Sequence, residues 1–187
     1  MHILTIFGGP RKRGHTAAVL RQFEAIALQH HAVERINVID RDVRGCLGCQ
    51  KCQKDFDHPG CCQQDDAPEI LERVLAADLI VYATPLYCWV FTAQMKALID
   101  RHYCLMKWEA RPYFSLMRGR RAALLVTCGD GIENNADVIQ TVFARQMACL
   151  ETSVAGSYIL PFCTPEKARG PEGAALAQRM AEELLGE

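Results

Sequence analysis

A basic segment at residues 8–16 carries residue types that bind anions. It has the sequence Gly-Gly-Pro-Arg-Lys-Arg-Gly-His-Thr and directly follows an apolar run at residues 3–7. A helix that begins here would offer unpaired N–H groups and a positive dipole end, and arginine donors suit phosphate geometry. The Walker A ending and the Gly-x-Gly-x-x-Gly dinucleotide pattern are both absent. We therefore expect a mononucleotide phosphate, with a solvated basic turn as the alternative.

Five of the ten cysteines lie close together in the sequence, which indicates metal or redox chemistry. Cys46, Cys49 and Cys52 are each separated by two residues, and Cys61 and Cys62 follow after a gap of eight residues. Three thiolates at this spacing can bind one face of a 4Fe–4S cluster, with Cys61 or Cys62 as the fourth ligand. A four-cysteine zinc site and a loop without metal are the alternatives. The candidate ligands are Cys46, Cys49, Cys52 and Cys61.

Two further segments have unusual compositions for loops. Residues 84–92 are apolar and aromatic, with Tyr87, Trp89 and Phe91, whereas surface loops are normally polar. Such a loop beside a phosphate site suits a flat ring such as isoalloxazine, although the same aromatics could form an oligomer interface. Residues 128–131, Cys-Gly-Asp-Gly, contain two glycines that allow close approach of the backbone to a ligand.

Alternating strand and helix patterns must position these segments. Apolar runs predict strands at residues 3–7, 33–39, 79–83, 122–127 and 154–160. Helical periodicity predicts helices at residues 16–27, 66–75, 95–102, 139–150 and 176–184, the second capped by Asp66. Strict alternation predicts a doubly wound α/β domain with a five-stranded parallel sheet in the order 2-1-3-4-5. It would be a single domain over residues 1–187 with a cysteine-rich loop at residues 40–65, and its ligand would bind where segments 8–16, 84–92 and 128–131 meet.

The bulk composition argues against several classes of protein. A net charge of −1 does not suggest a nucleic-acid or membrane-surface binder, and no apolar run approaches the ~18 residues of a membrane span. The first apolar run is short and is followed at once by glycines, unlike a secretory signal. We therefore expect a cytoplasmic protein without a disulfide framework.

Taken together, these motifs resemble a known family. The motifs are residues 9–16, 84–89 and 96–101, the cysteine segment 45–52 with Cys61 or Cys62, and the Asp-Asp pair at 65–66. They resemble the NADPH-dependent FMN reductase and iron–sulfur flavoprotein family, which has a flavodoxin-like fold. The resemblance runs from Ile3 to about Tyr158. The chain departs from the family at Gly9, where members usually have Ser, and at His15, where they usually have Asn.

The resemblance implies FMN at the strand ends. The phosphate would contact residues of the basic segment, the ring and ribityl chain would contact residues 85–90, and residues 127–130 would close the other side. The implied cofactor-binding residues are Pro10, Arg11, Lys12, Gly14, His15, Thr16, Pro85, Leu86, Tyr87, Cys88, Trp89, Val90, Thr127, Gly129 and Asp130.

The resemblance also implies an NAD(P)H-dependent oxidoreductase. FMN would take hydride from the nicotinamide cofactor and pass electrons to a quinone, a nitro compound, free flavin or an iron–sulfur centre. One rival is a non-enzymatic electron carrier or redox sensor that acts through the cysteine loop. The other is a zinc-stabilised binding module, but the intact basic segment at residues 8–16 argues against it. The partner would be a small-molecule acceptor or a redox protein, and Tyr103, Met106 and Trp108 are candidates for the interface of a homodimer or homotetramer.

Overall fold

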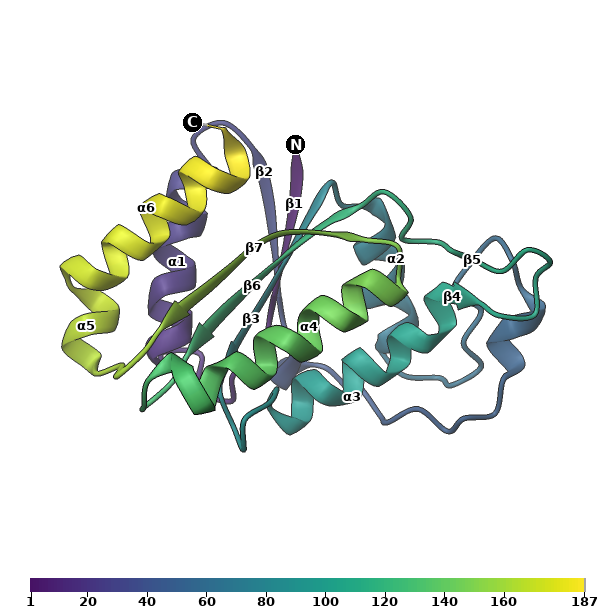
Figure 1. Ribbon diagram of the computed structural model, residues 1–187. Helices are drawn as coiled ribbons and strands as arrows, with labels where there is room; N and C mark the ends of the chain where they lie inside the picture. Colours follow the sequence, from purple (N-terminus) through teal and green to yellow (C-terminus); the bar gives the residue numbers. More distant parts are fainter. Residues whose placement is uncertain (187) are drawn as a thin grey trace.

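A parallel sheet forms the centre of the molecule. The computed structural model describes residues 1–186, and its main sheet has five strands in the order β2-β1-β3-β6-β7 (Figure 1). The strands are β1 (His2–Phe7), β2 (Ala32–Asn37), β3 (Leu79–Pro85), β6 (Arg121–Thr127) and β7 (Ser153–Leu160), all parallel to their neighbours. The order predicted from the alternation of strands and helices is therefore confirmed.

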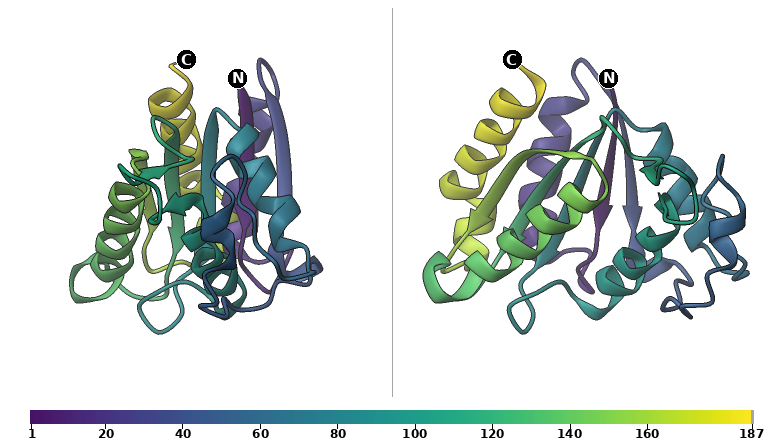
Figure 2. Two further views of the ribbon diagram at one scale, coloured as in Figure 1. Left: turned by 90° about the vertical axis from the view of Figure 1, so that its right-hand side faces the viewer. Right: turned by 45° about the vertical axis from the view of Figure 1, so that its right-hand side comes forward.

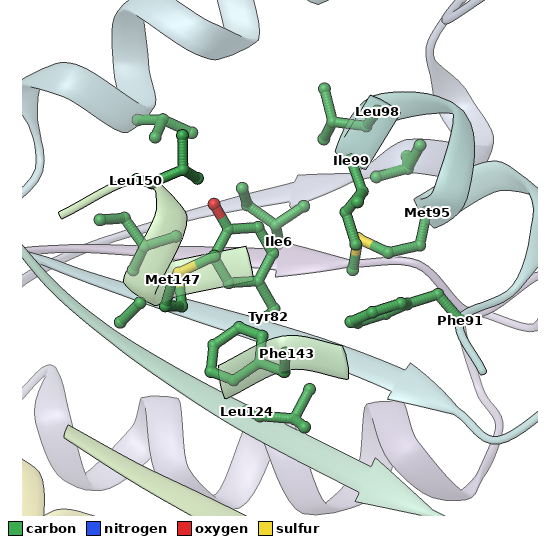
Figure 3. Packing of buried hydrophobic residues seen from close by; sticks show 14 of the residues in the cluster. Ile6, Tyr82, Phe91, Met95, Leu98, Ile99, Leu124, Phe143, Met147 and Leu150 are labelled. Carbon is green, nitrogen blue, oxygen red and sulfur yellow. The ribbon is translucent and has the colours of Figure 1, made fainter. Parts of the chain in front are cut away.

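Helices cover both faces of the sheet. Helices α1 (His15–Ala27), α5 (Pro165–Arg169) and α6 (Pro171–Leu185) lie on one face, and α2 (Ala67–Ala76), α3 (Ala93–Arg101) and α4 (Asp137–Cys149) lie on the other (Figure 1). Because side chains alternate along a strand, Ile3 packs under α1 and α6 while Leu4 packs on the opposite side. On that opposite side Tyr82 packs edge to face against Phe143, with ring centroids 5.8 Å apart (Figure 3).

The cysteine-rich segment lies beside a small hairpin at one end of the molecule. Strands β4 (Met106–Lys107) and β5 (Phe114–Ser115) pair antiparallel outside the main sheet (Figure 2). Gln53, in the short helical turn Lys51–Lys54, joins the segment to this hairpin. Its Nε2 donates to the carbonyl of Met106 at 2.9 Å, and its Oε1 accepts from the N–H of Trp108 at 2.7 Å. The hairpin was not predicted, because two-residue strands have no readable period.

Several predicted boundaries were wrong, among them the start of α6, which lies at Pro171 and not at residue 176. The second strand ends at Asn37, opposite Phe7 at the end of β1, and Val38–Asp40 forms a 3-10 turn. Helix α3 ends at Arg101, and a 3-10 turn follows it. Asp66 does occupy the cap position of α2, as predicted, but its side chain makes no capping hydrogen bond. Its Oδ2 instead accepts from the N–H of Asp42 at 2.9 Å. Across residues 1–186, no helix is both long and apolar enough to span a membrane.

Candidate functional site

The loops that follow β1, β3, β6 and β7 enclose a cavity of about 200 Å³, here called the strand-end cavity. Parallel strands bring their carboxyl ends to one edge, and the order reverses between β1 and β3, which is where such sheets bind ligands. Most of the predicted cofactor residues line this cavity: Pro10, Arg11, Gly14, His15, Thr16, Pro85, Leu86, Tyr87, Thr127 and Gly129.

One end of the strand-end cavity is the N-terminus of α1. No side chain within residues 1–186 caps this helix, and its first turn contains no acidic residue. Gly14 at the cap position donates its N–H to the carbonyl of Arg11 at 2.8 Å, and a Cβ on Gly14 would lie 3.0 Å from that oxygen. The next N–H groups have no partner within the helix. With Arg11 and His15 on the same cavity, this end of the site fits a phosphate.

The loop after β3 provides an aromatic rim. Tyr87 and Val90 exchange two backbone hydrogen bonds of 3.0 Å, which close a two-residue turn. Cys88 and Trp89 form its tip with φ of 47° and 64°, a left-handed conformation that is costly for residues other than glycine. Tyr87 is 45% exposed and Trp89 57% exposed. Large exposed aromatics at a cavity mouth suit stacking on a flat ring.

Two cysteine thiols line the remaining wall. Burial raises the pKa of Cys128, and burial together with the neighbouring Cys128 thiol raises the pKa of Cys163 to about 11. Both thiols therefore stay protonated at neutral pH and act as small apolar groups.

Some predicted cofactor residues do not line the strand-end cavity. Lys12 forms an ion pair with Asp40 at 2.9 Å. Cys88, Trp89 and Val90 are confined to the turn at the rim, and the carboxylate of Asp130 accepts the N–H of Gly131 at 2.8 Å.

Four residues of this cavity are absent from the cofactor-binding residues implied by the sequence: Phe7, Gly9, Cys128 and Cys163. Phe7 ends β1 and Cys163 follows β7 by three residues. Applying the strand-end rule to every strand, including the last one, would have found both.

The cysteine-rich segment surrounds a second cavity of about 20 Å³, here called the cysteine pocket. The candidate ligands Cys46, Cys49, Cys52 and Cys61 all line it, and so does Cys62. The Sγ atoms of Cys49 and Cys62 lie 3.7 Å apart. No set of three ligand-type side chains in the described part of the chain converges on a metal position, although the donor chemistry suits a thiolate-bound centre.

A buried ion pair fixes one cysteine of this pocket. The side chains of Arg101 and Asp65 are fully buried and meet at 2.5 and 3.0 Å. Arg101 also donates from Nη2 to Sγ of Cys61 at 3.1 Å. Burial opposes the charges, but the hydrogen bonds between these groups dominate, so the pKa of Asp65 is lowered and that of Arg101 is raised. Cys61 thus has a permanently charged donor beside its sulfur.

A buried lysine fixes the backbone of the same segment. Nζ of Lys107 donates to the carbonyls of His58 at 2.6 Å, Cys52 at 3.2 Å and Pro59 at 3.4 Å. Burial lowers the pKa of this amine. Lys107 therefore holds three backbone carbonyls of the cysteine-rich segment in place.

The family model for NADPH-dependent FMN reductase matches residues 1–161. The chain belongs to the NADPH-dependent FMN reductase family. Among curated relatives, an iron–sulfur flavoprotein of Archaeoglobus fulgidus is 32% identical over 156 residues, which cover 82% of this chain and 73% of that protein. An iron–sulfur flavoprotein of Methanocaldococcus jannaschii is 34% identical over 102 residues, 54% of this chain. The match spans about half of that relative, 51% of its length.

Solved structures share the fold of this FMN reductase family member. An FMN-dependent NADH-azoreductase from Bacillus anthracis, in complex with FMN, has a TM-score of 0.74 at 16% identity over 98% of this chain and 99% of that chain. An NAD(P)H:quinone oxidoreductase from Methanothermobacter marburgensis has a TM-score of 0.71 at 20% identity, over 98% and 96%. The flavodoxin-like fold, the family resemblance and, at the level of the family, an FMN-dependent oxidoreductase are confirmed. The individual site residues stay predictions.

Proposed function

We propose that this protein oxidises NADH or NADPH and passes the electrons through FMN to a small-molecule acceptor. The observation that carries the proposal is the strand-end cavity, where an uncapped helix N-terminus with Arg11 and His15 faces an aromatic rim. One end of the cavity suits a phosphate and the other a flat ring. Family membership supports the same cofactor.

Each part of the cavity has a distinct role in this proposal. Arg11, His15 and Thr16 bind the phosphate, and Pro85 and Leu86 lie along the ring. Bound FMN supplies hydride and electron transfer. Tyr87 and Trp89 exclude water from the exposed ring face and present an apolar surface to a planar acceptor such as a quinone. The name of the quinone oxidoreductase with the same fold agrees with this class of acceptor.

We propose a cluster-bearing electron carrier or sensor as the second candidate function, on the evidence of the cysteine pocket. Several curated relatives are named iron–sulfur flavoproteins, among them those of A. fulgidus and M. jannaschii. The candidate ligands are Cys46, Cys49, Cys52 and Cys61, of which Cys46 and Cys49 are exposed and Cys52 is buried. The hydrogen bond from Arg101 supports Cys61, rather than Cys62, as the fourth ligand, because donors to sulfur stabilise the thiolate form.

The same proposal includes a homodimer or homotetramer in the cytoplasm. An apolar cavity of about 380 Å³ between α3 and α4 is lined by Tyr103, Met106 and Trp108, the residues that the sequence suggested for an interface. Trp108 is 37% exposed and Tyr103 38% exposed. Ten free cysteines suit a reducing compartment.

An anaerobic absorption spectrum before and after addition of NADPH tests the proposal, with NADH in parallel. We expect flavin bands that bleach with the nucleotide. A broad shoulder near ~400 nm, with iron and sulfide by assay, supports the second candidate, and this shoulder should disappear in Cys61→Ala but persist in Cys62→Ala. A protein that binds no flavin after soaking with FMN contradicts the proposal.

A further inference from the structure

Two threonine side chains far apart in the sequence meet inside the strand-end cavity. Thr16 is the second residue of α1, and Thr127 is the last residue of β6. They are 3% and 5% exposed, and both line the cavity. Their Oγ1 atoms lie 2.6 Å apart, and within residues 1–186 neither hydroxyl has another hydrogen bond. The pair therefore joins the phosphate end of the cavity to the sheet.

The two hydroxyls of this pair have two protons to donate between them. Each hydroxyl has one proton to donate, and the bond between them uses one of the two. If Thr127 donates, the proton of Thr16 is free to point into the cavity. If Thr16 donates, the helix N-terminus loses one of its donors. An anion at the start of α1 favours the first arrangement, because it accepts the proton of Thr16 where the helix dipole already attracts negative charge.

The backbone of Thr127 is fixed, so its hydroxyl has a defined position. Thr127 pairs with Pro85 of β3 and Leu160 of β7 in the sheet register. Its carbonyl also accepts the N–H of Leu86 at 2.9 Å. The sheet therefore places this donor rigidly against α1.

We propose that Thr127 is a positioning residue that makes the site select FMN over riboflavin. It donates to Thr16, and Thr16 donates its own proton to a phosphate oxygen, so Thr127 acts through Thr16 and not by touching the phosphate. Hydrogen bonds in such a chain polarise and strengthen one another. The proposal rests on FMN binding at the strand-end cavity, and it changes the role expected for Thr127, which the sequence placed against the ring.

The test measures dissociation constants of FMN and of riboflavin by quenching of flavin fluorescence, in the wild type and in Thr127→Val and Thr127→Ser. Val keeps the shape of Thr and removes the hydroxyl, and Ser keeps the hydroxyl. We expect Thr127→Val to bind FMN about 3–10-fold more weakly and riboflavin unchanged, with Thr127→Ser like the wild type. After Thr16→Val, adding Thr127→Val should have no further effect on FMN. If Thr127→Val does not fold, Thr127→Ala makes the same comparison.

Two results overturn the inference. If Thr127→Val weakens the binding of FMN and riboflavin equally, Thr127 lies against the ring or has a purely structural role. If Thr127→Val leaves FMN binding unchanged, the hydroxyl of Thr127 does not contribute to phosphate binding. A wild-type protein that binds neither flavin refutes the proposed function as well, and that outcome is visible in the first titration before any variant is compared.

Discussion

Replacing Gly9 with the serine that the family usually has should destabilise this chain. A Cβ at Gly9 would lie 2.5 Å from Cζ of Phe7, 2.8 Å from its Cε2 and 3.2 Å from Cδ of Pro85. The Phe7 ring is 1% exposed and lies 5.6 Å from the Arg35 guanidinium, so it has little room to move. Overpacking of this kind costs about 1–3 kcal/mol. We expect Gly9→Ser to lower the free energy of unfolding by that amount in urea denaturation.

A double-mutant cycle tests the cause. Phe7→Leu removes the ring atoms that a serine would meet and by itself costs about 1–2 kcal/mol. The variant with both changes should be more stable than the sum of the single effects predicts, by about 1 kcal/mol or more. Gly129→Ser is the matched control, because a Cβ there meets no atom within 4 Å on the same cavity. Strictly additive effects, or a neutral Gly9→Ser, would refute the idea that Phe7 and Gly9 share one space.

Three further predictions concern stability. His102 is buried and neutral, and burial lowers its pKa from 6.5 to about 4. Between pH 6.5 and pH 4 the unfolded chain therefore binds a proton at His102 that the folded protein does not bind, and about 3 kcal/mol of stability should be lost as the pH falls through this range. The unfolding free energy of His102→Gln, measured against pH, should lack this part of the slope. Parallel curves for the wild type and His102→Gln would contradict the prediction. Cys88→Gly should raise the unfolding free energy by about 0.5–1 kcal/mol, because glycine tolerates the left-handed turn, and Cys88→Ala should not. Lys107→Met should cost about 1–3 kcal/mol and speed proteolysis of residues 45–62, since it leaves buried carbonyls without a donor, whereas the exposed Lys54→Met should do neither.

Much of the sheet could be predicted because its signal is local. Each strand is a short apolar run bounded by Gly, Pro or polar residues, and alternation with helices determines parallel pairing. The end of β2 was misplaced because Val38 continues the apolar run although its partner strand has already ended at Phe7. The cap position of α2 was predicted correctly at Asp66, but the capping hydrogen bond expected of its side chain does not form. The Asp66 carboxylate accepts instead from the N–H of Asp42, a contact between distant residues that no local pattern predicts, and Oδ1 of Asp65 accepts from the N–H of Ala67 at 3.2 Å.

The part of the candidate site that lies in the loops after the strands could be predicted from the sequence. The segments after β1, β3 and β6 do enclose one cavity, as expected. What could not be read is the pairing of side chains across long separations, such as Thr16 with Thr127. Buried Lys107 was also invisible, because a lysine in a sequence normally indicates an exposed position.

Helix α3 connects the two sites and determines their separation. At its N-terminus Thr92 caps the helix, because its Oγ1 accepts from the N–H of Met95 at 3.3 Å. The same Oγ1 donates at 2.5 Å to the carbonyl of Gly8, at the start of the basic segment at residues 8–16. At its C-terminus Arg101 donates to Cys61 in the cysteine pocket. Nine residues of helix rise roughly 14 Å, so one rigid element sets how far Cys61 lies from residues 8–16, the segment that we propose binds the flavin phosphate. Electron transfer between the two sites would then depend on a distance that the helix determines.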